Sequence, residues 1–571
     1  MIKSFEKIDK KIAFFLFLLV VISALIRGYN FQEWLLVRSD QIRDSGIARK
    51  VLDDGVGSLR LLGPKITKVE LPGEEGGETF NMGPFYYYSQ AISMKLYGDP
   101  SPWTIAIFDF VSSLLAIPLF YLAISRVFSK RISLLSTIFF SSSFLIIQYS
   151  RFSWNPNQLF FWQLFFIYFL LKFESANKKR AGFYLLWSFL GLLVISQLHF
   201  LAIIGTTLVF IGFFIYKKGW QKLKLKHYLL AFLLFFIFHI PIFVSDIKNE
   251  GENFQRMWYG VRQQSSEDGF FENFKETVEK SSRFYFYFVL PITEEEFDFI
   301  IPIRVLYLFI SLGFIGLIFL GKIKGDENKK TLSFVVLLYF MAFFFANIGM
   351  ADRLEKPRYW LSIAPISFFI LAFWLDLINK IKKKWFGTVL MLVISIVIIF
   401  ENGYSVYYWY ASLIAGDQIE IPFKDPILRP YRNLITLGEL ERAVDYMASE
   451  ARKARKGICY YSADYQTKSS YEYITSYNYP RIPIKALRDN EDSSKDCEMF
   501  LILRTGQDIK DIKEDLSNRF EYKKIYKDGA LIMWKLKVIA GRDYPARGIE
   551  AFNSKTKPDR VELWGEVFNS K

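Results

Sequence analysis

Long apolar runs, each bounded by charged residues, recur along residues 1–403. A helix needs about 20 mostly apolar residues to cross the hydrocarbon core of a membrane. Roughly eleven runs reach or approach that length, and they fall at 12–28, 103–125, 132–150, 157–173, 182–198, 200–216, 228–246, 301–321, 331–349, 359–379 and 386–403. The sequence therefore predicts an α-helical polytopic membrane protein.

Composition agrees with this prediction and argues against a nucleic-acid partner. Of 571 residues, 52% are hydrophobic and 18% are aromatic. The formal net charge of +15 could suit nucleic acid, but the Lys and Arg residues cluster in short loops between the apolar runs, as topology signals do. The first run lacks a small-residue cleavage site, so we expect it to remain as a signal anchor.

Basic residues also predict which loops face the cytoplasm. With the N-terminus inside, every second loop is rich in Lys and Arg, namely 7–11, 126–131, 178–180, 217–226, 322–330 and 380–384. The positive-inside rule then places the N-terminus in the cytoplasm and the long loops 29–102 and 247–300 outside it. We expect residues 1–403 to form the membrane domain, and 404–571 to form an extracytoplasmic α/β domain with a polar tail.

The expected elements of that second domain follow from its periodicity. Helices are predicted at Thr436–Ala454 and Asp508–Asn518, and strands at 457–462, 498–503 and 530–536, with one extra hairpin around Val561–Val567. The only two cysteines, Cys459 and Cys497, fall on or beside predicted strands. A disulfide outside the cytoplasm and two buried free thiols are both open, because sequence does not give their separation.

Carboxylates are the best candidates for chemistry. The chain has no Walker loop, Rossmann fingerprint, HExxH motif or CxxC pair, and it has only 3 histidines. Asp40 lies just beyond the first span, at the start of an amphipathic helix predicted through about Leu52. There it could abstract a proton or simply cap the helix. Asp109 and Asp246 lie near the ends of spans rather than at the membrane midplane, which disfavours a proton-coupled transporter.

Several short motifs resemble a known family in their order and spacing against the spans. They are Asp40-Gln41 with Ala48 and Leu52, Leu61–Pro64, Gly83–Tyr88 leading to Leu96–Gly98, Tyr149–Arg151, Trp154–Asn157, and Pro241 with Asp246 and Asn253. Together they resemble bacterial GT-C membrane glycosyltransferases, in the branch with the aminoarabinose and protein O-mannosyl transferases. The resemblance covers most of the membrane region.

The resemblance implies transfer of a sugar from a polyprenyl-phosphate donor to a lipid, glycan or protein acceptor at the extracytoplasmic face. Asp40 matches the family's first-loop catalytic aspartate, acting as a base or as a metal-held orienter. Displacement in one step would invert the anomeric centre. Arg151 occupies the matching phosphate-binding position, and we add Arg358 and Arg283 because guanidinium groups suit phosphates.

One departure from the family lies beside Asp40. The family often has Glu at the next position, where Gln41 is neutral, so the divalent cation is an open question. Asp44 lies one helical turn beyond Asp40 and could compensate as a second catalytic carboxylate.

Further substrate-binding candidates are Tyr86, Tyr87, Asn155 and Asp246.

Other interpretations stay open at this point. Arg151 could be a headgroup anchor, Tyr86–Tyr88 an interfacial aromatic belt, and Asp246 a helix cap. The whole chain could be a transporter, or a non-enzymatic scaffold that displays its C-terminal domain. Among enzymes, a polysaccharide polymerase or ligase with a diphosphate-linked donor is also compatible with the sequence.

Overall fold

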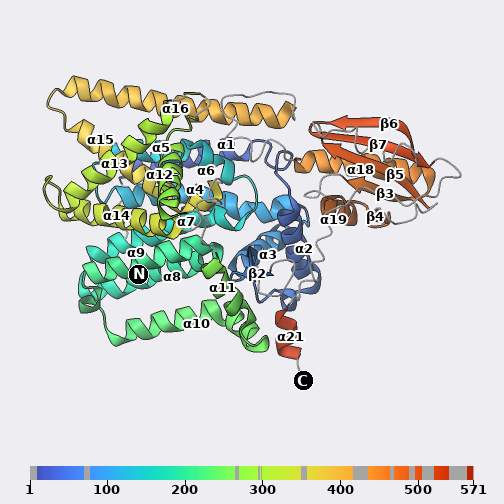
Figure 1. Ribbon diagram of the computed structural model, residues 1–571, viewed down its shortest axis with the longest axis horizontal. Coiled ribbons are helices and arrows are strands. Elements are labelled where there is room, and N and C mark those ends of the chain that lie inside the picture. The colour runs from blue at the N-terminus through green and yellow to red at the C-terminus, as the bar shows by residue number, and fades with distance from the viewer. Residues whose placement is uncertain are drawn as a thin grey trace.

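The computed structural model describes residues 9–69, 78–263, 269–293, 296–297, 299–348, 357–415, 435–462, 468–487, 496–504, 520–538 and 562–569. Within these residues, eight helical segments are long and apolar enough to cross a membrane. They are α1 (Lys10–Gly28), α4 (Pro102–Ile124), α8 (Lys178–Leu198), α10 (Leu225–Lys248), α13 (Ile300–Phe319), α14 (Glu327–Ile348), η6 with α15 (Pro357–Ile363 and Ala364–Asn379) and α16 (Lys384–Ala415). By the length and composition of these helices, the chain is a multi-pass membrane protein. Figure 1 shows how the helices are arranged.

The three other predicted spans are helical but shorter. Residues 132–150 form α5 (Lys130–Ser142) and α6 (Phe144–Tyr149), residues 157–173 form η3 (Asn155–Gln158) and α7 (Leu159–Glu174), and residues 200–216 form α9 (Phe200–Tyr216). The predicted division of 182–216 is confirmed, because α8 ends at Leu198 and α9 begins at Phe200. The count of eleven membrane crossings stays a prediction.

The predicted continuous helix over 132–150 is wrong, because the backbone leaves the helical conformation at Ser143. The amide of Phe144, the first residue of α6, donates to Asn402 Oδ1 on α16 at 2.7 Å. Ser143 Oγ donates to the carbonyl of Phe288 at 2.7 Å. A break in a buried helix is stable where side chains satisfy the freed backbone groups, as Asn402 does for the amide of Phe144.

Aromatic packing forms the interior of the helical region, while α10 lies at its edge. Phe120 of α4 stacks on Phe140 of α5 and on Phe369 of α15, with ring centroids 4.6 and 5.4 Å apart. On α10, by contrast, Phe232 and Leu233 are exposed. Helices that present apolar side chains outward in this way are suited to contact lipid.

The first long loop forms two helices and a hairpin. These are α2 (Ser39–Asp54), the turn η2 (Val56–Ser58), strands β1 (Lys65–Val69) and β2 (Glu78–Asn81), and α3 (Phe85–Tyr97). The amide of Gly63 donates to the carbonyl of Met82 at 2.8 Å. A Cβ on Gly63 would lie 2.0 Å from the carbonyl oxygen of Gly83. Gly63 is therefore needed for close backbone approach, whereas a Cβ on Gly83 would meet the side chain of Gln197.

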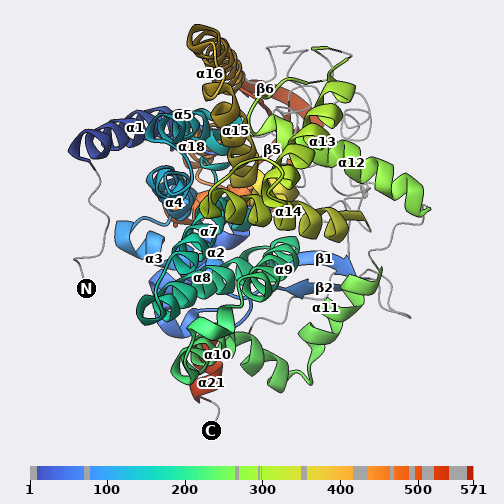
Figure 2. The ribbon, with the colours of Figure 1, turned by 90° about the vertical axis from the view of Figure 1, so that its left-hand side faces the viewer.

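The second long loop contains α11 (Glu252–Gln263) and α12 (Phe270–Tyr287). Figure 2 shows α11 beside the hairpin of β1 and β2. Asn253 joins them: its Oδ1 accepts from the Asn81 amide at 2.7 Å, and its Nδ2 donates to the Asn81 carbonyl at 3.1 Å. The two long loops thus contact each other.

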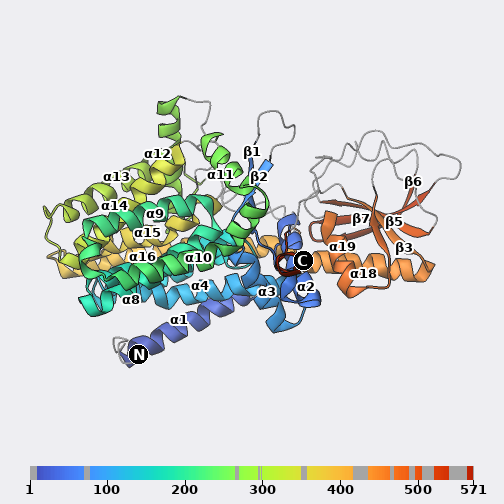
Figure 3. The same ribbon diagram turned by 90° about the horizontal axis from the view of Figure 1, so that it is seen from below.

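The C-terminal region holds a five-stranded mixed sheet at one end of the long helices (Figure 3). Its strands are β3 (Gly457–Ser462), β4 (Ile484–Ala486), β5 (Cys497–Arg504), β6 (Phe520–Asp528) and β7 (Leu531–Val538), in the order β4-β3-β5-β7-β6. The helices are α18 (Leu437–Ala454) and α19 (Lys468–Asn478). The three predicted strands and the helix at Thr436–Ala454 are confirmed, β4, β6 and α19 are additional, and 508–518 lies outside the described residues.

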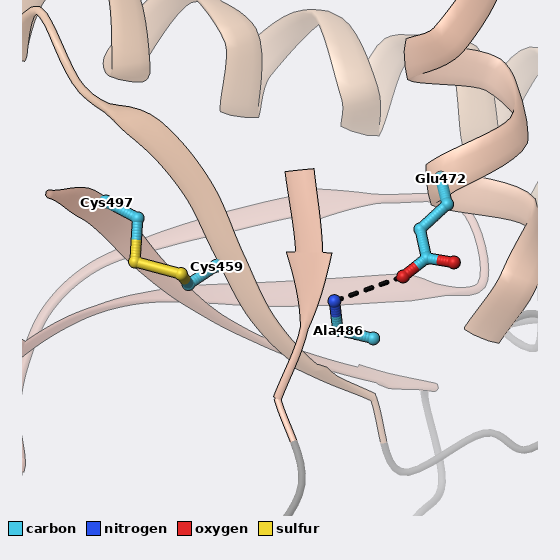
Figure 4. The surroundings of a disulfide bond; sticks show 4 residues. All are labelled: Cys459, Glu472, Ala486 and Cys497. Carbon is cyan, nitrogen blue, oxygen red and sulfur yellow. Dashed lines mark hydrogen bonds between the residues drawn. A yellow bond between two sulfur atoms is a disulfide. The ribbon is translucent and has the colours of Figure 1, made fainter. Parts of the chain in front are cut away.

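A disulfide links Cys459 to Cys497, with Cα atoms 5.6 Å apart (Figure 4). The two residues lie on β3 and β5, which pair in parallel with Gly457 opposite Cys497. Figure 4 also shows Glu472 of α19 accepting from the amide of Ala486 on β4. The bridge therefore joins neighbouring strands in the centre of the sheet.

The predicted hairpin around Val561–Val567 is wrong within its described part. Leu563 forms an isolated antiparallel bridge with Arg60, and the helix α21 (Trp564–Asn569) follows it. The strand-forming contact is therefore made with the first long loop rather than within the tail. Such a distant partner cannot be inferred from local periodicity.

Candidate functional site

Asp40 lies in the first turn of α2 but does not cap the helix. Arg38, in an extended conformation, is the N-cap residue. Gln41 Oε1 accepts from the Arg38 amide at 3.0 Å, and so satisfies one of the backbone groups at the start of the helix. The side chain of Asp40 is thereby left for other contacts. The predicted amphipathic helix is confirmed, and it ends two residues beyond Leu52.

Arg43 joins the two candidate carboxylates. Its Nη1 contacts Asp40 Oδ1 at 3.0 Å, while its Nε and Nη2 contact Asp44 Oδ1 at 3.0 and 2.8 Å. The side chain of Asp40 is 46% exposed, whereas that of Asp44 is 3% exposed. Asp40 can therefore meet a substrate, while Asp44 is placed to hold the guanidinium.

Burial sets the electrostatics of this group. Loss of water raises the pKa of the Asp44 carboxyl, and the Arg43 guanidinium opposes that rise. Burial also raises the pKa of Tyr87 on α3, whose phenol interacts with the charges of Asp44 and Arg43. The Arg60 guanidinium lies over the Tyr87 ring, 5.9 Å from its centroid. One partly exposed carboxylate is thus framed by two arginines and a buried phenol.

A network of hydrogen bonds between buried polar side chains connects α3 to α4. Gln90 Nε2 donates to Ser153 Oγ at 2.8 Å, and Ser153 Oγ lies 2.6 Å from the Tyr86 hydroxyl. The Tyr86 hydroxyl donates to Asp109 Oδ2 at 3.1 Å. Tyr86 and Tyr87 therefore lie inside the protein rather than in an interfacial belt.

The loop 150–158 connects this hydrogen-bond network to α2, which carries Asp40. Gln41 Nε2 donates to the carbonyl of Ser153 at 2.7 Å, so the loop is attached to α2. Asn155 Nδ2 donates to the carbonyl of Leu198 at the end of α8. Gln41 and Asn155, both predicted from motifs, thus connect the loop 150–158 to α2 and to the end of α8.

Arg358 contacts the same loop through Trp154. Its guanidinium lies 4.9 Å from the Trp154 ring centroid and 4.8 Å from that of Tyr359, and its Nη2 donates to the Tyr359 hydroxyl at 2.8 Å. His199 lies next to Tyr359, with ring centroids 5.9 Å apart. Stacking on aromatic faces leaves the edge of a guanidinium available for a planar anion such as phosphate.

Arg151 has a different setting and is 1% exposed. Its Nη1 donates to the carbonyl of Arg27 at 2.6 Å and to the Tyr410 hydroxyl at 3.0 Å. Its Nη2 lies 3.5 Å from the carbonyl of Asn30. The guanidinium therefore joins the C-terminal end of α1 to α16, where helix carbonyls favour a positive charge.

The two remaining candidates make contacts at the start of the second long loop and within it. Asp246 Oδ1 accepts from the amides of Asn253 and Phe254 at 3.1 and 3.2 Å, at the start of α11. Arg283 pairs with Glu279 on α12 at 3.4 Å. The structure thus brings Asp40, Asp44 and Tyr87 together, and places Asp246 and Arg283 in other contacts.

Sequence reasoning missed Arg43, Arg60 and Ser153. Arg43 could have been found from its position three residues after Asp40 and next to Asp44, where a helical side chain can reach both. Among the described residues, no group of three or more His, Cys, Asp and Glu could hold a metal ion.

The chain is similar to a known protein family over part of its length and to a solved structure over most of it. Residues 81–244 match the family model for dolichyl-phosphate-mannose-protein mannosyltransferase. The crystal structure of ArnT from Cupriavidus metallidurans in the apo state is similar at 12% identity and TM-score 0.52, covering 92% of this chain and 98% of that chain. ArnT from the same organism bound to undecaprenyl phosphate matches at 12% identity and TM-score 0.49, covering 91% and 98%. No curated protein matches the chain.

Proposed function

Because the chain has the fold of the GT-C membrane glycosyltransferases, we propose that it transfers a sugar from a polyprenyl-phosphate donor to an acceptor at the extracytoplasmic face. The observation that carries this proposal is the half-exposed carboxylate of Asp40, which Arg43 contacts at 3.0 Å just beyond the first span. The family model also supports it, because its description names a dolichyl-phosphate donor.

Asp40 acts as the base in this proposal. The acceptor hydroxyl gives its proton to the carboxylate as its oxygen attacks the anomeric carbon. The bond between that carbon and the phosphate oxygen breaks, and its electron pair leaves with the polyprenyl phosphate. A single displacement inverts the anomeric centre. Asp44 supports the step indirectly, because it holds Arg43 beside Asp40.

Arg358 is the proposed partner of the donor phosphate. The rings of Trp154 and Tyr359 fix its guanidinium, and Trp154 directly follows Ser153, whose carbonyl binds Gln41 of α2. The loop 150–158 therefore couples the proposed phosphate partner to the helix that carries Asp40. Charge-assisted bonds from guanidinium to phosphate are among the stronger hydrogen bonds in proteins.

The distribution of basic residues supports an extracytoplasmic site and a cytoplasmic N-terminus. We further propose that residues 1–403 are the catalytic membrane domain and 404–571 an extracytoplasmic domain. The N-terminal end of α1 and the sheet lie at opposite ends of the long helices in Figure 3. This arrangement fits the proposed orientation.

Asp40→Asn tests the proposal, with Asp54→Asn at the exposed end of α2 as the matched control. Mass spectrometry of lipids that copurify with the wild-type protein first identifies the donor. We expect Asp40→Asn to bind undecaprenyl phosphate as the wild type does, but to lose transfer of that sugar at least 100-fold, because the base is absent. Asp54→Asn should transfer normally. Wild-type transfer by Asp40→Asn would overturn the role of Asp40.

A further inference from the structure

The segment that leads into α2 pairs with a distant part of the chain. The amide of Leu437 donates to the Leu35 carbonyl at 2.8 Å, and the amide of Gly438 donates to the Glu33 carbonyl at 3.1 Å. The amide of Val37 donates to the Ile435 carbonyl at 3.4 Å. Residues 435–438 therefore hold residues 33–37 by backbone contacts that end three residues before Asp40.

Side chains of the C-terminal region hold residues 435–438 in place. Thr436 caps α18, with its amide donating to Glu439 Oε2 at 2.8 Å. The other oxygen of Glu439 accepts from the Ala530 amide at 2.8 Å, in the turn between β6 and β7. Arg442 of α18 forms ion pairs with Glu33 and with Asp528. The pairing segment is thus fixed to both the helix and the sheet of the C-terminal region.

A second contact holds the C-terminal half of α2. Arg49 Nη1 donates to Ser476 Oγ of α19 at 2.6 Å, and the Arg49 guanidinium lies 6.0 Å from the Tyr473 ring centroid. The Tyr473 hydroxyl donates to the Pro100 carbonyl at 2.6 Å, in the turn before α4. Figures 1 and 3 both show the start of α18 next to α2. The C-terminal region therefore contacts the chain on both sides of Asp40, Arg43 and Asp44, before α2 and within its second half.

We propose that residues 435–438 are a positioning segment for Asp40, and that the C-terminal region sets the geometry of the catalytic helix. This inference rests on the proposed function. A helix of mixed polarity outside the membrane gains little from lipid, so tertiary contacts must fix where it begins. Misplacement of a reacting group by about 1 Å can lower a rate about 100-fold, so loss of this pairing should lower kcat rather than donor affinity.

Leu437→Pro removes the shortest of the three backbone bonds in the pairing while keeping α18. Leu437 is the first residue of α18, a position that favours proline, because its amide has no partner within the helix. Thr436, which precedes it, is extended with φ −81° and ψ 160°, as a residue before proline should be. Proline therefore removes the bond to Leu35 and pushes its ring against that carbonyl. Leu437→Ala is the matched control, because it shortens the side chain but keeps the amide.

Three measurements on full-length protein in detergent decide the outcome: hydrogen exchange, kcat and donor affinity. Hydrogen exchange of the α2 amides should be at least tenfold faster in Leu437→Pro than in Leu437→Ala. The kcat for transfer from the copurified donor should be about tenfold lower in the proline variant, with undecaprenyl phosphate affinity unchanged. Equal α2 exchange and equal kcat in the two variants would overturn the proposal, and so would a fall in donor affinity alone.

The two proposals can fail separately. If the wild-type protein transfers no sugar, the proposed function fails, while the exchange experiment still decides whether the segment holds α2. If Leu437→Pro does not fold, Glu33→Ala is the second variant, because it removes the ion pair with Arg442 at a half-exposed site. It should speed α2 exchange and lower kcat about threefold, since an exposed pair contributes less than about 1 kcal/mol. Wild-type values for both would overturn the proposal.

Discussion

The regions around Arg151 and Arg358 contain the same kind of side chain in opposite situations. Both guanidinium groups lie over aromatic rings, Arg151 at 4.9 Å from Tyr410 and Arg358 at 4.9 Å from Trp154. Arg151 is buried and donates to backbone carbonyls at the end of α1, whereas Arg358 is half-buried and contacts Tyr359 and Trp154. The comparison teaches that a guanidinium at a position matching a ligand-binding motif can also join helices, so the motif alone does not assign its role.

Arg151→Ala should give the largest effect, on stability. It leaves the carbonyls of Arg27 and Asn30 without this donor and opens space between Phe31, Trp409 and Tyr410. We expect a loss of about 3 kcal/mol, measured by thermal unfolding in detergent, with undecaprenyl phosphate affinity unchanged below the transition. Unchanged stability together with lost affinity would instead make Arg151 a phosphate ligand.

Arg358→Ala should give the converse result. Because its proposed partner is the donor phosphate, we expect affinity for undecaprenyl phosphate to fall about 30-fold, equivalent to about 2 kcal/mol. Thermal stability should change little. Arg358→Lys, which keeps the charge but loses the planar fork, should recover part of the affinity. An unchanged binding constant for the alanine variant would remove Arg358 from the site.

His199 provides a pH-dependent reporter of the Arg358 region. Burial, and then the Arg358 charge, lower the pKa of His199 from 6.5 to about 3. Below pH 6.5 the unfolded chain binds a proton that the folded protein excludes, so stability should fall by about 1.4 kcal/mol per pH unit toward pH 3.

Thermal unfolding between pH 7 and pH 5 measures this slope. We expect His199→Gln to flatten it, whereas Arg358→Ala should leave it in place over this range, because burial is the larger cause of the lowered pKa of His199. A slope that His199→Gln does not change would assign the pH dependence to other groups.

The smallest expected effects separate two tyrosine hydroxyls. The Tyr410 hydroxyl accepts from Arg151 and donates to the Ile26 carbonyl at 2.6 Å, so Tyr410→Phe should lower stability by about 1 kcal/mol. Tyr359→Phe removes a bond to Arg358 and should instead weaken undecaprenyl phosphate binding about threefold. If both variants changed stability and undecaprenyl phosphate binding equally, the Arg151 and Arg358 regions would not differ in role.

Local patterns in the sequence predicted most of the membrane helices, the helix after the first span, and the strands of the C-terminal sheet. They failed at Ser143, where the helix break depends on Asn402, a residue far away in the chain. Asp40 and Tyr87 could be proposed because they lie in short motifs. Arg43 was overlooked as a local partner, and the pairing of Leu35 with Leu437 has no local signal, because register between distant segments depends on the finished fold.

The pairing beside Asp40 also has a consequence for biosynthesis. Glu33 and Arg442, which form one of its ion pairs, are 409 residues apart. At about 5–20 residues per second, a ribosome needs on the order of 20 to 80 seconds to travel that distance. Helix α2 leaves the ribosome early, but its partner emerges only after α16 has been made. A nascent or truncated chain would therefore carry Asp40 without its final support, which ties the onset of activity to completion of the polypeptide.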